Sequence, residues 1–154
     1  MIIDSLQDFC SFLNKISPIL AIDLGEKKLG FSISDHSYKM ALPAYVVKVS
    51  SEKDKIEAIV SAIMKYKACA LVVGIPFNMN GSESEQTTKI RKFAQNLAAK
   101  IALPIYLQDE RLTSRAAHSL LKETGMKRRE RDAVDDSVAA SLILDTVIQR
   151  INII

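Results

Sequence analysis

Acidic residues recur in this chain where an apolar run ends or a helical pattern begins. One lies inside the apolar run "ILAIDLG" of residues 19–25, where an unpaired carboxylate would be costly to bury. Two follow the run "LPIYLQ", and two precede "SVAASLIL". Carboxylates gathered in one place repel each other, and hard divalent cations such as Mg²⁺ remove that repulsion. Two such ions about 3.5–4 Å apart can activate water and stabilise the leaving oxygen of a phosphodiester. The candidates are Asp23, Asp109, Glu110, Asp135 and Asp136.

Each acidic position also has an ordinary structural interpretation. Asp23 could cap the turn that begins at Gly25. The Asp-Glu-Arg triplet at 109–111 could form a surface salt-bridge cluster. The acidic pair at 135–136 could serve only the dipole of a helix that begins there. The chemical interpretation requires all three sites to meet, and ligands of an open α/β sheet gather outside the carboxyl ends of its strands.

The hydrophobic pattern predicts the elements that would bring these sites to one edge. Short apolar runs predict strands, and runs with a period near 3.6 predict helices. Ser82 and Glu85 have capping-box spacing, which predicts a helix start there. Five strands are expected: three come in succession, and the other two alternate with helices. This order predicts an α/β fold with a mixed sheet and helices on both faces. The strands are expected at 19–24, 28–34, 43–50, 69–76 and 103–110, and the helices at 4–15, 51–67, about 82–101, 113–123 and about 131–150.

Length and composition favour one globular domain. The chain has 154 residues, of which 48% are hydrophobic and 25% charged. No apolar run approaches the roughly 20 residues of a membrane span, and the N-terminal stretch lacks the basic region of a signal peptide. Cys10 and Cys69 are too few for a disulfide framework, so a cytoplasmic location is expected. The net charge of +3 permits a phosphate-rich partner without indicating one.

Four ordered blocks of the sequence resemble the YqgF (RuvX) family of RuvC-like nucleases. The blocks are "ILAIDLGEKKLGFSISD", "VVGIPFNMNGSESEQTTKIRKFAQNLA", "LPIYLQDERLTSRAAHSLL" and "VDDSVAASLIL". The resemblance covers residues 18–150 and implies a ribonuclease H-like domain over 18–154, preceded by a helical extension over 1–17 that is expected to pack on its outside. "IDLG" also opens the actin and sugar-kinase superfamily, but those proteins need two such domains around a nucleotide, and the other blocks do not belong to their pattern.

The resemblance implies a metal site made by three acids. Asp23, Glu110 and Asp136 match the family's acidic positions and are expected to be catalytic and to bind Mg²⁺ or Mn²⁺. Asp109 and Asp135 are adjacent acids, and which member of each pair faces the metals stays open. Strand alternation places Asp109 and Glu110 on opposite faces, so only one of them is expected to face the metals. Glu26 departs from the family, which usually has a small polar residue after the first glycine.

The function implied is hydrolysis of phosphodiester bonds during maturation of the 5′ end of pre-16S ribosomal RNA. The alternatives are a Holliday-junction resolvase that acts on branched DNA and an RNA- or ribosome-binding module without nuclease activity. RNA, branched DNA and ribosomal precursor particles are therefore the expected partners, and the oligomeric state is open. Gly25 and Gly30 are interpreted as a tight hairpin that lets a phosphate approach. The basic run "KRRER" at 127–131 could also be a solvated connection between helices. The candidate phosphate contacts are Lys27, Lys28, Arg111, Arg115, Lys127, Arg128 and Arg129.

Overall fold

The computed structural model describes residues 1–111 and 128–154, with the side chains of the second stretch described from Asp136 onward. The helix expected at 113–123, and with it Arg115 and Lys127, lies outside the described residues. The strands are β1 (Ile2–Ile3), β2 (Ile19–Leu24), β3 (Lys28–Ser34), β4 (Ala41–Lys48), β5 (Ala70–Ile75) and β6 (Ile105–Asp109). The helices are α1 (Leu6–Cys10), α2 (Glu52–Tyr66), α3 (Glu85–Ala98) and α5 (Arg128–Ile153).

The strands form one mixed sheet in the order β1-β6-β5-β2-β3-β4. β2, β3 and β4 are antiparallel neighbours, whereas β5 pairs in parallel with both β2 and β6. The mixed α/β sheet is confirmed, with six strands in the described part of the chain rather than five. The additional strand is β1, in which Ile2 pairs with Ile105 and Ile3 with Tyr106. Two residues are too few to show a period in the sequence.

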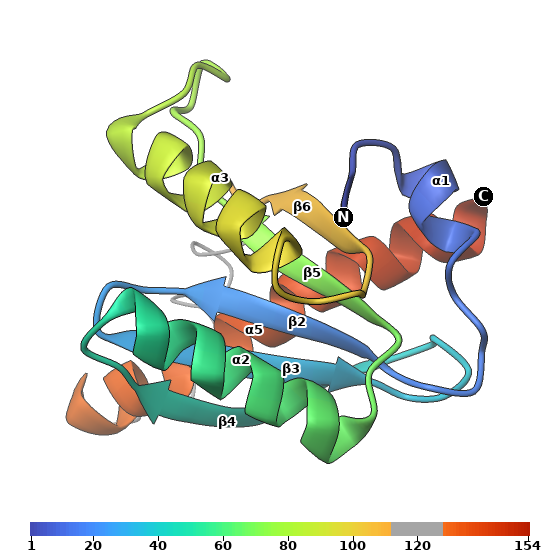
Figure 1. Cartoon of the computed structure of the whole chain (residues 1–154), viewed down its shortest axis with the longest axis horizontal. Helices are drawn as coiled ribbons and strands as arrows, with labels where there is room; N and C mark the ends of the chain where they lie inside the picture. Colours follow the sequence, from blue (N-terminus) through green and yellow to red (C-terminus); the bar gives the residue numbers. More distant parts are fainter. Residues whose placement is uncertain (112–127) are drawn as a thin grey trace.

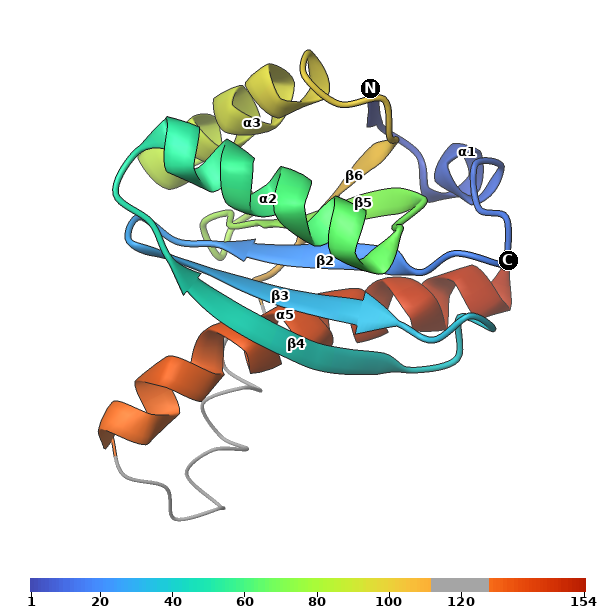
Figure 2. The same cartoon turned by 60° about the horizontal axis from the view of Figure 1, so that its bottom comes forward.

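Helices cover both faces of the sheet, as the sequence predicts (Figures 1 and 2). α2 and α3 lie on one face, and α5 runs across the other. Alternate residues of each strand feed two separate cores, so Leu20 and Ile22 pack on the α2 side while Ile19 and Ala21 pack on the α5 side. No helix of the described residues is long and apolar enough to cross a membrane.

The N-terminal segment packs against the domain and adds apolar residues to the core on the α5 side of the sheet. Phe9 of α1 is fully buried and lies against Tyr106 of β6, with ring centroids 5.5 Å apart. α1 spans only five residues, capped by the Ser5 hydroxyl, which accepts from the Asp8 amide at 3.0 Å. A single turn of helix is not stable by itself, so this burial holds α1 in place.

The capping box of α3 is formed by Ser84 and Thr87 rather than by Ser82 and Glu85. The Thr87 amide donates to Ser84 Oγ at 3.2 Å, and the Ser84 amide donates to Thr87 Oγ1 at 3.0 Å. Ser82 Oγ instead donates to Asn80 Oδ1 at 2.7 Å inside the preceding turn. The Thr87 hydroxyl also donates to the Pro76 carbonyl, which fixes the start of α3 to the end of β5.

Candidate active site

The carboxyl ends of β2, β5 and β6 meet at one edge of the sheet, because these strands are parallel neighbours. Asp23 is the penultimate residue of β2 and is half-buried. Ile19 and Ala21 face α5, so strand alternation puts Asp23 on that face too. Glu110 directly follows β6, and its amide donates to the Ile75 carbonyl at 3.1 Å. Two of the three predicted ligands therefore lie at the same edge.

Close packing of α5 on β3 brings Asp136 to this edge. Gly30 pairs directly with Asp23 across the sheet. A Cβ atom at Gly30 would lie 1.9 Å from the Asp136 carbonyl oxygen and 2.8 Å from the Ser137 nitrogen. The helix backbone thus rests on the strand backbone, beside the residue paired with Asp23. The interpretation of Gly30 as part of a hairpin turn is wrong, since Gly30 lies inside β3 and makes room for α5.

A second glycine makes room for Glu110. A Cβ atom at Gly74 would lie 2.5 Å from Glu110 Oε2 and 2.5 Å from Ile143 Cδ1 of α5. The Glu110 carboxylate therefore stands over β5, on the side that faces α5. Gly74 is not among the site residues predicted from the sequence. The available signal is a glycine inside "ALVVGI", because a glycine within a buried strand marks a close approach by another group.

The Glu110 carboxylate is electrostatically destabilised. Burial, and to a lesser extent the nearby charge of Asp109, raises its pKa to about 7. Within the described residues, its side chain has no hydrogen-bond or ion-pair partner. A neighbouring cation would stabilise the charged form of such a group.

Asp109 has a different environment from Glu110. Arg111 donates to it from Nε at 2.8 Å and from its amide at 3.0 Å, and Arg111 Nη2 lies 2.7 Å from Asp109 Oδ2. The salt-bridge interpretation of the triplet thus applies to its first and last members. Arg111 also reaches the turn at Gly81, where a Cβ atom would lie 3.4 Å from Arg111 Nη1.

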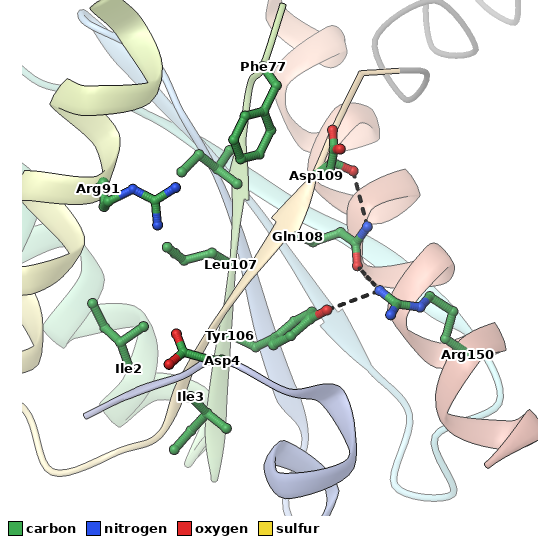
Figure 3. Close-up of a pocket in the computed structure, with 11 residues that line it drawn as sticks. Ile2, Ile3, Asp4, Phe77, Arg91, Tyr106, Leu107, Gln108, Asp109 and Arg150 are labelled. Carbon is green, nitrogen blue, oxygen red and sulfur yellow. Dashed lines mark hydrogen bonds between the residues drawn. The ribbon is translucent and has the colours of Figure 1, made fainter. Parts of the chain in front are cut away.

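Hydrogen bonds tie the strand that carries these acids to α5. The residues involved line a hollow along β6 of about 200 Å³. Figure 3 shows their side chains and the hydrogen bonds between them. Arg150 Nη1 donates to Gln108 Oε1 at 2.9 Å and to the Tyr106 hydroxyl at 3.0 Å. Gln108 Nε2 in turn donates to the Asp109 carbonyl at 3.0 Å. These contacts fix the end of β6 relative to the helix that carries Asp136.

The remaining predicted residues lie around the same end of the sheet. α5 begins at Arg128, so Asp135 and Asp136 lie about two turns inside the helix. The helix-dipole interpretation of this pair is therefore wrong, because that interaction fades within the first turn. Arg128 and Arg129 belong to α5. At these two positions, the interpretation of the basic run as a connection between helices is therefore wrong. Lys27 and Lys28 lie at the β2–β3 hairpin, where the Lys27 carbonyl accepts from the Val49 amide at 2.9 Å.

The donor chemistry fits a hard divalent cation, although the side chains are not gathered as ligands. Three carboxylic acids share one edge, and oxygen is the donor that Mg²⁺ and Mn²⁺ prefer. Within residues 1–111 and the described part of α5, no three His, Cys, Asp or Glu side chains form a group that could hold a metal ion. The arrangement thus supplies the acids and a destabilised carboxylate, and a cation would require side-chain adjustment.

Two solved structures of junction-bound resolvases share this fold. The Thermus thermophilus RuvC in complex with a Holliday junction substrate aligns with a TM-score of 0.55 at 15% identity, over 88% of this chain and 96% of that one. The fowlpox virus resolvase in complex with Holliday junction DNA aligns with a TM-score of 0.55 at 11% identity, over 86% and 97%. These alignments define the fold class as ribonuclease H-like.

Sequence comparison identifies the family within this class. The RuvX family, described as Holliday junction resolvase, matches residues 17–150. A protein of Rickettsia bellii (strain OSU 85-389) named "Putative pre-16S rRNA nuclease" is 46% identical over 152 residues, which is 99% of each chain. A protein of the same name from Rickettsia akari (strain Hartford) is 47% identical over 148 residues, or 96% of each. The chain belongs to the RuvX family and is a nuclease, a hydrolase of phosphodiester bonds.

Proposed function

We propose that the chain is a metal-dependent endonuclease that processes the 5′ end of pre-16S ribosomal RNA in the cytoplasm. The observation that carries this proposal is the position of the Glu110 carboxylate, held over Gly74 at the edge where Asp23 ends β2 and α5 brings in Asp136. The names of relatives that are 46% identical over almost their full length support the RNA substrate. Ribosomal precursor particles are the proposed partners, since the RNA named in those relatives is part of them.

Asp23, Glu110 and Asp136 are the proposed metal ligands. When bound, Mg²⁺ or Mn²⁺ would polarise the scissile phosphate and lower the pKa of a coordinated water. Burial of the Glu110 carboxylate keeps competing water away and raises its pKa. A bound cation would favour the charged form and lower that pKa. Asp109, paired with Arg111, positions the end of β6 rather than binding the metal. Asp135 is proposed only as a neighbouring acid.

The basic residues around this edge are proposed to bind phosphates that flank the cleaved bond. Lys27 and Lys28 lie at the hairpin, and Arg111 lies between Asp109 and the Gly81 turn. Arg115, Lys127, Arg128 and Arg129 complete the proposed set. Such contacts position a backbone without reading its sequence. Residues 18–154 are the proposed nuclease domain, with residues 1–17 as an extension that contributes β1 and α1.

A second candidate function is resolution of Holliday junctions. It is supported by the description of the matching family and by the fold shared with two junction-bound resolvases. A junction has two symmetric cleavage positions, so this activity favours a two-fold symmetric dimer.

Cleavage assays on both substrates separate these functions. The purified chain is incubated with a pre-16S 5′ fragment or a four-way DNA junction, with Mg²⁺, Mn²⁺ or EDTA. We expect metal-dependent cleavage of the RNA, abolished by Asp23→Asn and Glu110→Gln. Glu57→Gln, which changes an exposed acid on α2, serves as the matched control. Preference for the junction would identify a resolvase, and cleavage that survives both active-site variants would place the site elsewhere.

A further inference from the structure

A pair of lysines lies directly opposite each other across the sheet, close to the proposed active site. Lys28 of β3 and Lys48 of β4 are register partners. Like charges in this position repel each other and destabilise the pair of strands. Within the described residues, neither lysine forms an ion pair. Among the described side chains nothing neutralises this repulsion, and a bound anion would relieve it.

The pair faces the same side of the sheet as the acids. Lys28 precedes Gly30 by two residues on β3, so both positions face α5. Two residues of extended chain span about 7 Å, which is therefore the distance along the strand between the lysine pair and the place where Asp136 meets Gly30. An anion held by the lysines would lie beside the acidic edge.

The surroundings of the pair are open and mainly basic. Lys27, Lys28 and Lys48 line one surface hollow of about 560 Å³, together with Glu26, Val49 and Ser50. Glu26 is the only acidic residue among those lining groups. Figure 2 shows the β2–β3 hairpin beside the connection from β4 to α2, with the first turns of α5 extending past the sheet at the same end. Lys48 is exposed, so the hollow that it lines is accessible to a polyanion.

Protection of a sheet edge does not explain both lysines. β4 is an edge strand, and a charged side chain such as Lys48 discourages pairing with another chain. Lys28, however, lies on β3, which is paired on both sides. Edge protection gives no reason for a second lysine opposite the first.

We propose that Lys28 and Lys48 together hold one backbone phosphate of the nucleic acid, next to the phosphate that is cleaved. This inference rests on the proposed nuclease function and adds Lys48 to the substrate-binding residues. The two ammonium groups act on one phosphate, so their mutual repulsion is relieved only when the substrate is bound. In the free protein, this repulsion slightly lowers the free energy of unfolding.

Salt-dependent binding tests the proposal without cleavage. A fluorescein-labelled RNA stem–loop with a single-stranded 5′ extension is titrated in EDTA between about 50 and 200 mM salt. Losing one phosphate contact lowers the salt slope by about 0.7 to 0.9 and weakens binding about tenfold at the lowest salt. We expect this for Lys48→Gln, with recovery in Lys48→Arg. Lys100→Gln, which removes an exposed lysine beyond α3, is the charge-matched control.

The double variant tests the shared phosphate. If one phosphate is held by both lysines, Lys28→Gln combined with Lys48→Gln loses little more than either single variant. The unfolding midpoint of Lys48→Gln should equal or exceed that of the wild type, because repulsion is removed. A Lys48→Gln slope equal to that of Lys100→Gln overturns the proposal, as does a double variant that loses two full contacts. The cleavage results for Asp23→Asn and Glu110→Gln test the nuclease function separately.

Discussion

Replacing Gly74 with alanine would test whether the Glu110 carboxylate acts where the structure places it. The added Cβ atom would lie 2.5 Å from Glu110 Oε2 and 2.5 Å from Ile143 Cδ1. Ordinary van der Waals contact begins near 3.4 Å. Both side-chain ends must therefore retreat by about 0.9 Å, and the Glu110 oxygen must move away from β5.

The expected effects on stability and on activity differ in size. Both crowded atoms are ends of flexible side chains, so we expect the free energy of unfolding to fall by only about 1–2 kcal/mol. A displacement near 1 Å of a catalytic group can lower the rate about 100-fold. Gly74→Ala should thus fold and bind substrate, and lose about two orders of magnitude in the cleavage step.

Single-turnover cleavage at saturating protein, together with urea unfolding, measures the two quantities. Ala70→Gly is the matched control, because it weakens the same strand on the same face at the end away from Glu110. Near wild-type cleavage by Gly74→Ala would refute the assigned position of Glu110. Equal losses of activity in both variants would show that strand stability, rather than the carboxylate, sets the rate.

Two further predictions concern the same edge. Gly30→Ala places a Cβ atom 1.9 Å from the Asp136 carbonyl oxygen, which belongs to backbone and cannot rotate away. We expect a loss of about 3 kcal/mol in urea unfolding, and an unchanged unfolding curve would contradict the close packing of α5 on β3. In EDTA, the raised Glu110 pKa means that the folded state holds a proton that the unfolded state has lost between pH 4.5 and about 7. Stability should therefore fall across that range as pH rises, by at most about 3 kcal/mol. Glu110→Gln should remove this fall, and thermal unfolding of both proteins against pH measures it.

Most of the sheet could be predicted from the sequence because its signals are local. Residues 19–24 and 28–34 are strands as expected, since their apolar content and the turn at Gly25 lie within a few residues of each other. The strand expected at 43–50 occupies Ala41–Lys48 instead, and boundaries of this kind depend on pairing with β3. β1 was missed because its only support is pairing with β6, about 100 residues away in the chain.

The acids could be proposed from residue type and position, but the groups that pack against Gly30 and Gly74 could not. An acid at the end of a strand is visible in the sequence, and so is its resemblance to a family motif. The role of Gly30 depends on Asp136, and the role of Gly74 depends on Glu110 and Ile143. These contacts join segments that are far apart in the chain, so no local pattern contains them.

The two glycines explain how the acids can lie at the same edge of the sheet. Like charges come together at this edge only where intervening side chains are absent, and at Gly30 and Gly74 the sheet has none. Placing Glu110 there has an electrostatic cost, because burial and the nearby charge of Asp109 raise its pKa to about 7. A proton can offset that cost in the free protein, and a divalent cation can offset it more strongly. The same reasoning applies to Lys28 and Lys48. These two positive charges repel each other, and a bound phosphate would reduce that repulsion. Glu110 and the lysine pair are thus neighbouring groups of opposite charge, which is what an enzyme needs to hold a cation and a polyanion side by side.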